Sequence, residues 1–147
     1  MKKIITAALA ALVCVSAAAQ LNVKKKQAAI ETITTLRTGA VRLIARDSLI
    51  CVSLPSDTQF DGPQVFYLGK GVDSAIETLD DLFQLVQEGE VGSSVEVDQA
   101  GKTVTVRVGK QVGVRVLYFN FPMQAGSVST SKGELEKMKS ALVKWNK

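Results

Sequence analysis

Histidine is absent from all 147 residues of this sequence. Its absence excludes the Ser-His-Asp and Cys-His catalytic arrangements, which need an imidazole as general base. It also removes the commonest protein ligand of zinc and copper. The adjacent carboxylates Asp80 and Asp81 would point about 100° apart on a helix, so they do not form a catalytic dyad by themselves. We therefore expect a protein that is not an enzyme and that has no metal or cofactor. The alternative, a hydrolase using carboxylates, needs a facing pair that the sequence does not reveal.

Cysteine is scarce, with Cys14 and Cys51 as the only two. Cys14 lies in a segment that we expect to be removed, so the mature chain has no partner for an intramolecular disulfide. Cys51 falls in the middle of an expected strand. We interpret it as a small buried hydrophobe, because no imidazole is present to activate its thiol. The alternative is an intermolecular disulfide.

The first 19 residues have the composition of a secretory signal peptide. Lys2 and Lys3 precede an apolar stretch at residues 4–15, and three alanines at residues 17–19 provide a cleavage site before Gln20 or Leu21. The apolar stretch is too short for a comfortable membrane span. We expect bacterial export to the periplasm or the exterior, and no integral membrane segment in the mature chain.

Positive and negative charges nearly balance once the signal peptide is removed. Without its two lysines the chain keeps 16 basic and 14 acidic residues, a net charge of +2. This balance favours no nucleic-acid partner and no membrane-surface partner. The remaining 128 residues suit one domain. We expect an N-terminal segment at residues 20–39, helical over residues 27–38, and a single α+β domain at residues 40–147.

Hydrophobic periodicity predicts the elements of that domain. Ser-x-x-Glu sequences at Ser74 and Ser131 predict the starts of two amphipathic helices, the first ending at Gly89. Apolar alternation predicts strands at residues 41–45, 49–54, 64–68 and 93–97, and a hairpin over residues 103–121 with its turn at residues 109–111. In chain order, these strands and helices form two successive βββα units. They predict a two-layer fold, with a mainly antiparallel sheet of about six strands and two or three helices on one face.

The hairpin at residues 103–121 contains the first candidate binding surface. Its valines alternate with polar residues up to Val116, but from Leu117 onward the large apolar residues have the opposite parity. Either a bulge returns them to the core, or they form a second, exposed apolar face. An exposed face would bind a protein partner or a second copy of the chain. The residues predicted for this face are Leu49, Phe66, Leu117, Phe119 and Phe121.

A second candidate site is the connection from strand to helix at residues 69–74. Gly69 and Gly71 would let backbone amides turn toward an anion, Lys70 would add charge, and Ser74 opens the helix. The other interpretation of these residues is an ordinary turn. Our first hypothesis is thus an exported, non-catalytic binding protein, with the exposed face as its binding surface, and the alternative is a small domain that binds an anionic ligand at this turn.

Overall fold

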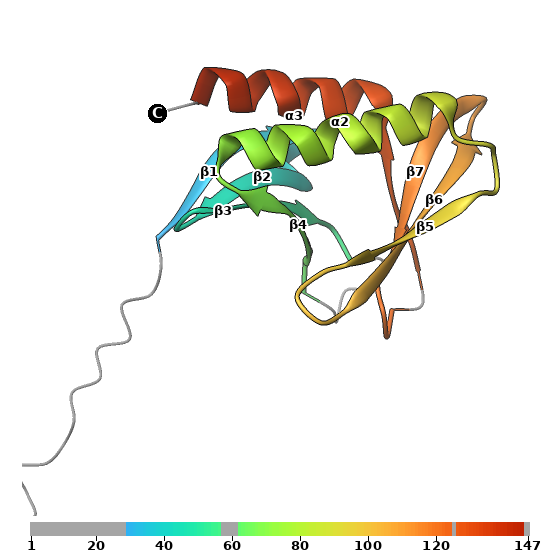
Figure 1. Cartoon of the computed structure of the whole chain (residues 1–147), viewed down its shortest axis with the longest axis horizontal. Helices are drawn as coiled ribbons and strands as arrows, with labels where there is room; N and C mark the ends of the chain where they lie inside the picture. Colours follow the sequence, from blue (N-terminus) through green and yellow to red (C-terminus); the bar gives the residue numbers. More distant parts are fainter. Residues whose placement is uncertain (1–28, 57–61, 125, 146–147) are drawn as a thin grey trace, which may run out of the picture.

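Two successive ββββα units make up the described part of the chain (Figure 1). The computed structural model describes residues 29–56, 62–124 and 126–145. The first unit contains β1 (Ile30–Leu36), the 3-10 helix η1 (Arg37–Gly39), β2 (Val41–Arg46), β3 (Leu49–Leu54), β4 (Gln64–Lys70) and α2 (Val72–Glu88). The second contains β5 (Ser94–Asp98), β6 (Thr103–Gln111), β7 (Val114–Asn120), β8 (Val128–Ser131) and α3 (Lys132–Trp145).

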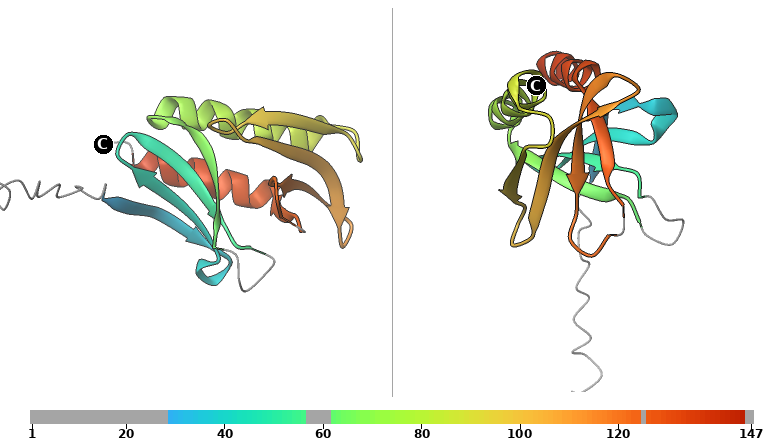
Figure 2. Two further views of the ribbon diagram at one scale, coloured as in Figure 1. Left: turned by 90° about the horizontal axis from the view of Figure 1, so that it is seen from below. Right: turned by 90° about the vertical axis from the view of Figure 1, so that its right-hand side faces the viewer.

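Each unit forms its own antiparallel sheet, in the order β1-β2-β3-β4 for sheet A and β5-β6-β7-β8 for sheet B. The two helices lie side by side over both sheets, which diverge below them (Figures 1 and 2). The predicted α+β class with antiparallel strands is confirmed. The prediction of one sheet of about six strands is wrong, because the described residues form two sheets of four strands and the two halves do not share a ladder. Neither described α-helix combines the length and the apolar composition that a bilayer span requires.

Strand β1 corrects the helix predicted over residues 27–38. Five of its seven residues are β-branched isoleucine or threonine, which suit a pleated strand better than a helix. The helix-like spacing of Ile33 and Leu36 has a different cause. Ile33 is an extra residue in a bulge, since Thr32 pairs with Ile44 and Thr34 with Leu43. The bulge lets Ile33 and Leu36 point to the same side.

Strand β8 has no counterpart among the strands predicted from the sequence. It pairs with β7, with Ser129 opposite Tyr118, and it buries Val128 and Thr130 on alternate positions. The helix start predicted at Ser131 is confirmed, because the Glu134 carboxylate accepts the Ser131 backbone N–H at 2.9 Å. The start predicted at Ser74 is wrong. Helix α2 begins at Val72 after Gly71, and no side chain caps its first turn.

The turn of the β6–β7 hairpin lies at Val112-Gly113, and not at residues 109–111. Both turn residues have positive φ, 50° and 80°, as a two-residue type I′ turn requires. Moving the turn reverses the parity of the second strand, so Val108 pairs with Leu117 and Val106 with Phe119. The parity change after Val116 therefore needs no bulge. The exposed valines are those nearest the turn, with Val114 58% and Val112 99% exposed.

The apolar face predicted at the surface is mostly interior. Phe66, Leu117, Phe119 and Phe121 are all buried, and only Leu49 remains exposed, at 41%. The rings of Phe66 in sheet A and Phe119 in sheet B meet edge to face, with centroids 5.0 Å apart. The inward sides of both sheets thus share one core with the helices.

Each half also supplies a side chain that binds the last strand of the other half. Gln99, in the β5–β6 turn, accepts the Tyr67 N–H of β4 at 2.5 Å and donates to the Tyr67 carbonyl at 3.2 Å. Arg37, in the equivalent β1–β2 connection, donates to the Ser129 carbonyl of β8. A third contact, from Arg115, joins sheet B to the end of α2, because Arg115 donates to the Gly89 carbonyl just beyond the helix C-terminus at 2.8 Å. These bonds fix the relative position of the halves.

Replacing the core phenylalanine Phe119 with alanine tests its burial. Phe119→Ala leaves a cavity beside Phe66 and should lower the free energy of unfolding by about 3–5 kcal/mol. The matched control is Val114→Ala on the same strand, which should cost about 0.5 kcal/mol because Val114 lies at the surface. Urea unfolding followed by circular dichroism measures both. Equal losses in the two variants would contradict the assigned parity.

Candidate functional site

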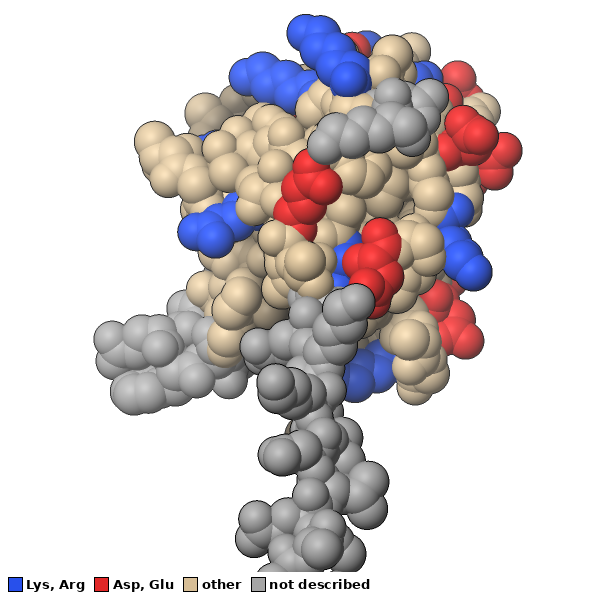
Figure 3. All heavy atoms as spheres, turned by 90° about the vertical axis from the view of Figure 1, so that its left-hand side faces the viewer, with Lys and Arg blue, Asp and Glu red and all other residues tan. Residues whose placement is uncertain are grey.

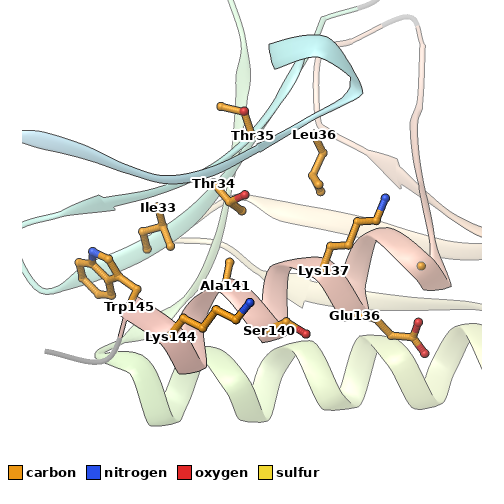
Figure 4. Close-up of a pocket in the computed structure, with 11 residues that line it drawn as sticks. Ile33, Thr34, Thr35, Leu36, Glu136, Lys137, Ser140, Ala141, Lys144 and Trp145 are labelled. Atoms are coloured by element: carbon orange, nitrogen blue, oxygen red, sulfur yellow. The ribbon is translucent and has the colours of Figure 1, made fainter.

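A groove of about 870 Å³ lies between strand β1 and helix α3 (Figure 4). The two elements run in opposite directions. Ile33, Thr34 and Leu36 point from β1 toward the helix, whereas Thr35 points away (Figure 4). Helix α3 contributes lining residues along its length, from Gly133 to Trp145. The lining residues are Ile33, Thr34, Thr35, Leu36, Gly133, Glu136, Lys137, Ser140, Ala141, Lys144 and Trp145.

The floor of the groove is apolar and belongs to the edge of the core. Ile33, Leu36, Ala141 and Trp145 are partly buried and pack against the buried residues of both sheets. Their remaining exposed surface is apolar area that water still covers, and its burial under a ligand would be favourable. The core is therefore incompletely covered along this groove.

Side-chain bonds close the groove at both ends. At one end the Trp145 indole N–H donates to the Glu31 carboxylate at 2.9 Å. At the other end the Arg37 guanidinium binds both oxygens of Glu134, at 2.5 and 2.7 Å. A bidentate pair of this kind has a fixed geometry. The strand and the helix are thus held together at their ends and stand apart between them.

At the Arg37 end of the groove, two residues have an unfavourable backbone conformation. Arg37 and Thr38 have φ values of 49° and 53°, in the left-handed region that non-glycine residues avoid. Such conformations persist when surrounding contacts hold them in place. Here the contacts are the bonds from Arg37 to Glu134 and to the Ser129 carbonyl. The connection between β1 and β2 is therefore shaped to bring Arg37 to the start of α3.

Strand β1 differs from the other outer strand of its sheet. Gln99 occupies both backbone groups of Tyr67 on the outer edge of β4. The outer edge of β1 has no strand partner, because β2 is the only strand paired with it in the described ranges. Four consecutive residues of β1, 33–36, line the groove, so the groove runs along this strand. An edge strand presents alternate N–H and C=O groups that a further strand can pair with. The groove therefore combines an apolar floor with a hydrogen-bonding wall.

The two helices carry charges of opposite sign. Helix α2 carries five acidic residues and no basic one, whereas α3 carries four lysines and two glutamates. Figure 3 shows basic side chains gathered at the top of the view and acidic ones at its centre and right, with further basic side chains at the left, right and bottom. One ion pair joins the helices, because Lys139 binds Asp80 at 2.5 Å. The α3 side of the molecule, which holds the groove, is the more basic one.

At the Arg37 end of the groove, the surroundings of Glu134 alter the pKa of its carboxylate. Burial by itself would raise it. The hydrogen bonds and charge of Arg37, together with hydrogen bonds from Ser131, outweigh burial and hold the pKa of Glu134 below its ordinary value. The carboxylate is therefore charged at neutral pH and remains bound to Arg37.

The predicted ligand-binding residues lie together at the β4–α2 connection. However, contacts within the protein already use one of their backbone N–H groups and the space beside Gly69. The Gly71 N–H donates to the Ser48 carbonyl at 2.8 Å. Gly69 is packed so closely on Ser74 that an added Cβ would lie 2.4 Å from the Ser74 Oγ. Glycine is thus needed there for close packing. Lys70 is exposed.

The remaining predicted positions do not assemble into a site. Leu49 lies at the surface in a hollow of about 350 Å³ that Tyr67, Gly69 and Gln99 also line. Cys51 is buried, and burial raises the pKa of its thiol, with only partial compensation by Arg46. Within the described ranges no three histidine, cysteine, aspartate or glutamate residues come close enough to hold a metal ion.

Comparison of the chain with protein-family models, with curated proteins and with solved structures finds no match.

Sequence reasoning missed the groove because it assigned β1 to a helix. The signal that identifies β1 is its run of β-branched residues between Ile30 and Thr35. No comparable signal places α3 against β1. That contact joins residues about a hundred positions apart, and it depends on the path of the whole chain.

The Arg37–Glu134 pair gives a pH-dependent contribution to stability. The pKa of Glu134 is lower in the folded state than in the unfolded state, where it is about 4.3. The pair therefore contributes fully to the free energy of unfolding above the unfolded-state pKa, and this contribution is lost as the pH falls through the folded-state pKa. Glu134→Gln should therefore cost about 1 kcal/mol at pH 7 and progressively less below pH 5. Urea unfolding between pH 3 and 7 measures this difference. Glu136→Gln, on an exposed position of the same helix, is the control and should show no such trend. Parallel curves for the wild type and Glu134→Gln would contradict the assignment.

Proposed function

We propose that this chain is a non-catalytic binding protein that holds an extended polypeptide segment in the groove between β1 and α3. The segment lies along β1 as an additional strand of sheet A. The observation that carries the proposal is the combination, in one groove, of an outer strand edge and an apolar floor. Strand addition uses these two features together, because main-chain bonds supply affinity and pockets for alternate side chains supply specificity.

The dimensions of the groove suit a short extended segment. Seven residues of β1 span about 20 Å at the rise of an antiparallel strand. The bonds at Glu31 and Arg37 mark the two ends of this span. A ligand of about five or six extended residues would fill it. Because both ends are already held by side-chain bonds, binding would require little rearrangement of the protein, which lowers its entropic cost.

The residues in the groove support binding better than catalysis. Its ionisable groups are Lys137, Lys144 and Glu136, and none of them forms a hydrogen bond with a described residue that would make it a general base for a nucleophile. The chain also has no histidine. The buried Cys51 lies on β3, away from the groove lining.

Occupation of the groove can be measured directly, because Trp145 is the only tryptophan of the chain and lines the groove. The probe is a blocked heptapeptide of alternating threonine and valine, titrated against the wild type while the tryptophan emission is recorded. We expect a saturable change. Ala141→Phe fills the floor and should weaken binding at least tenfold. The control is Val143→Phe on the exposed side of the same helix, which should bind as the wild type does. No change in emission at millimolar peptide, or equal binding by Ala141→Phe, would refute the proposal.

We also propose that the protein works outside the cytoplasm. The support is the signal-like composition of residues 1–19, which lie outside the described residues. Expression in a bacterium with export machinery, followed by N-terminal sequencing of the mature protein, should yield Gln20 or Leu21 as the first residue. A chain that keeps Met1 in the cytoplasmic fraction would exclude export.

A further inference from the structure

Helix α3 sorts its four lysines onto two sides. Lys132 and Lys139, seven residues apart, face α2. The Lys132 ammonium lies 4.8 Å from the centre of the Phe83 ring, and Lys139 binds Asp80. Lys137 and Lys144 are also seven residues apart, but they line the groove on the other side of the helix. The second pair is thus separated from the acidic residues of α2.

The two groove lysines have no partner in the part of the chain that the structure describes. Neither ammonium forms an ion pair or a hydrogen bond there. The nearest acidic residue in sequence, Glu136, points away from β1 and leaves Lys137 free to extend toward Leu36 (Figure 4). The two end carboxylates, Glu31 and Glu134, are bonded to Trp145 and Arg37. Two unpaired positive charges therefore border an apolar floor.

From this arrangement we infer that the occupant of the groove is an acidic extended segment, with two carboxylates on one side of its chain. The inference rests on the proposed function of the groove. Seven helical residues separate the lysine backbones by about 10 Å. Side chains on one face of a strand are about 7 Å apart at two residues and about 14 Å apart at four. Both spacings are within the reach of flexible lysine side chains, so acidic residues two or four positions apart can meet both ammonium groups.

A second copy of this chain is a poorer occupant. If two molecules paired through their β1 edges, the twofold axis would bring Lys137 and Lys144 of one copy near the same residues of the other. Like charges in that position oppose association. The acidic surface of this protein lies on α2, which is a helix and cannot pair with a strand edge. A different polypeptide, extended and acidic, fits both the charge and the backbone geometry.

The test uses three blocked threonine–valine heptapeptides and the emission of Trp145. One has glutamate at positions 2 and 6, one has lysine there, and one is neutral. We expect the acidic peptide to bind about 3- to 30-fold more tightly than the neutral one, from two exposed ion pairs. The lysine peptide should bind more weakly than the neutral one. Raising the salt from 50 to 500 mM should remove most of the acidic preference.

Matched variants assign the preference to the groove. The double variant Lys137→Glu/Lys144→Glu should reverse the order and favour the lysine peptide. Lys110→Glu, on an exposed position of β6 outside the groove, should leave the order unchanged. Methylating alternate backbone nitrogens of the acidic peptide should abolish its binding, because pairing with β1 needs those N–H groups.

The possible failures are distinguishable. If the neutral peptide binds and the acidic one binds no better, the charge inference is refuted and the groove proposal stands. If the methylated peptide binds as tightly as its parent, the acidic ligand is held by charge alone and its placement along β1 is refuted. If no peptide changes the emission of Trp145, the proposed function and the inference are both refuted.

Discussion

Neither four-stranded sheet of this protein can cover its own inner face, and the structure depends on that constraint. Helix α2 follows β4 and also contacts β7, while α3 follows β8 and crosses to β1. Each helix thus covers part of the sheet that it does not follow. The contact between Phe66 and Phe119 joins the two sheets beneath the helices. Because the inner faces share one core, neither ββββα unit buries its apolar residues without the other.

The same constraint explains where the sheet edges are closed. An exposed strand edge promotes unwanted pairing, and proteins cover it with side chains or other elements. Gln99 binds the edge of β4 and Arg37 binds a carbonyl of β8, each from the equivalent turn of the opposite half. The first strand of sheet A has no such cover from the described residues. Its edge is left beside α3, where partly buried apolar residues also remain in contact with water. Strand β5, at the end of sheet B, is likewise paired on one side alone within the described ranges. What sets β1 apart is the apolar floor beside its edge, and this is the edge that we propose binds a ligand.

Local patterns predicted much of this fold, and the errors have identifiable physical causes. The amphipathic periods of α2 and α3 and the apolar alternation of β2, β3 and β6 act over short distances, and each predicted the type and approximate place of its element correctly. The bulge at Ile33 produced a helix-like spacing within a strand. A turn displaced to Val112-Gly113 reversed the orientation of Phe119, and with it the predicted binding face. The groove could not be predicted, because it arises only where β1 and α3 meet across the whole length of the chain.

The position of α3 has a consequence for the order in which this protein matures. The hairpins of both sheets join residues close in sequence and can form as soon as those residues are available. The cover over β1, however, comes from the last helix, which ends at Trp145. A growing chain therefore has no complete core until α3 has been synthesised. The hairpins of both sheets thus form before the helix that completes their shared core is available.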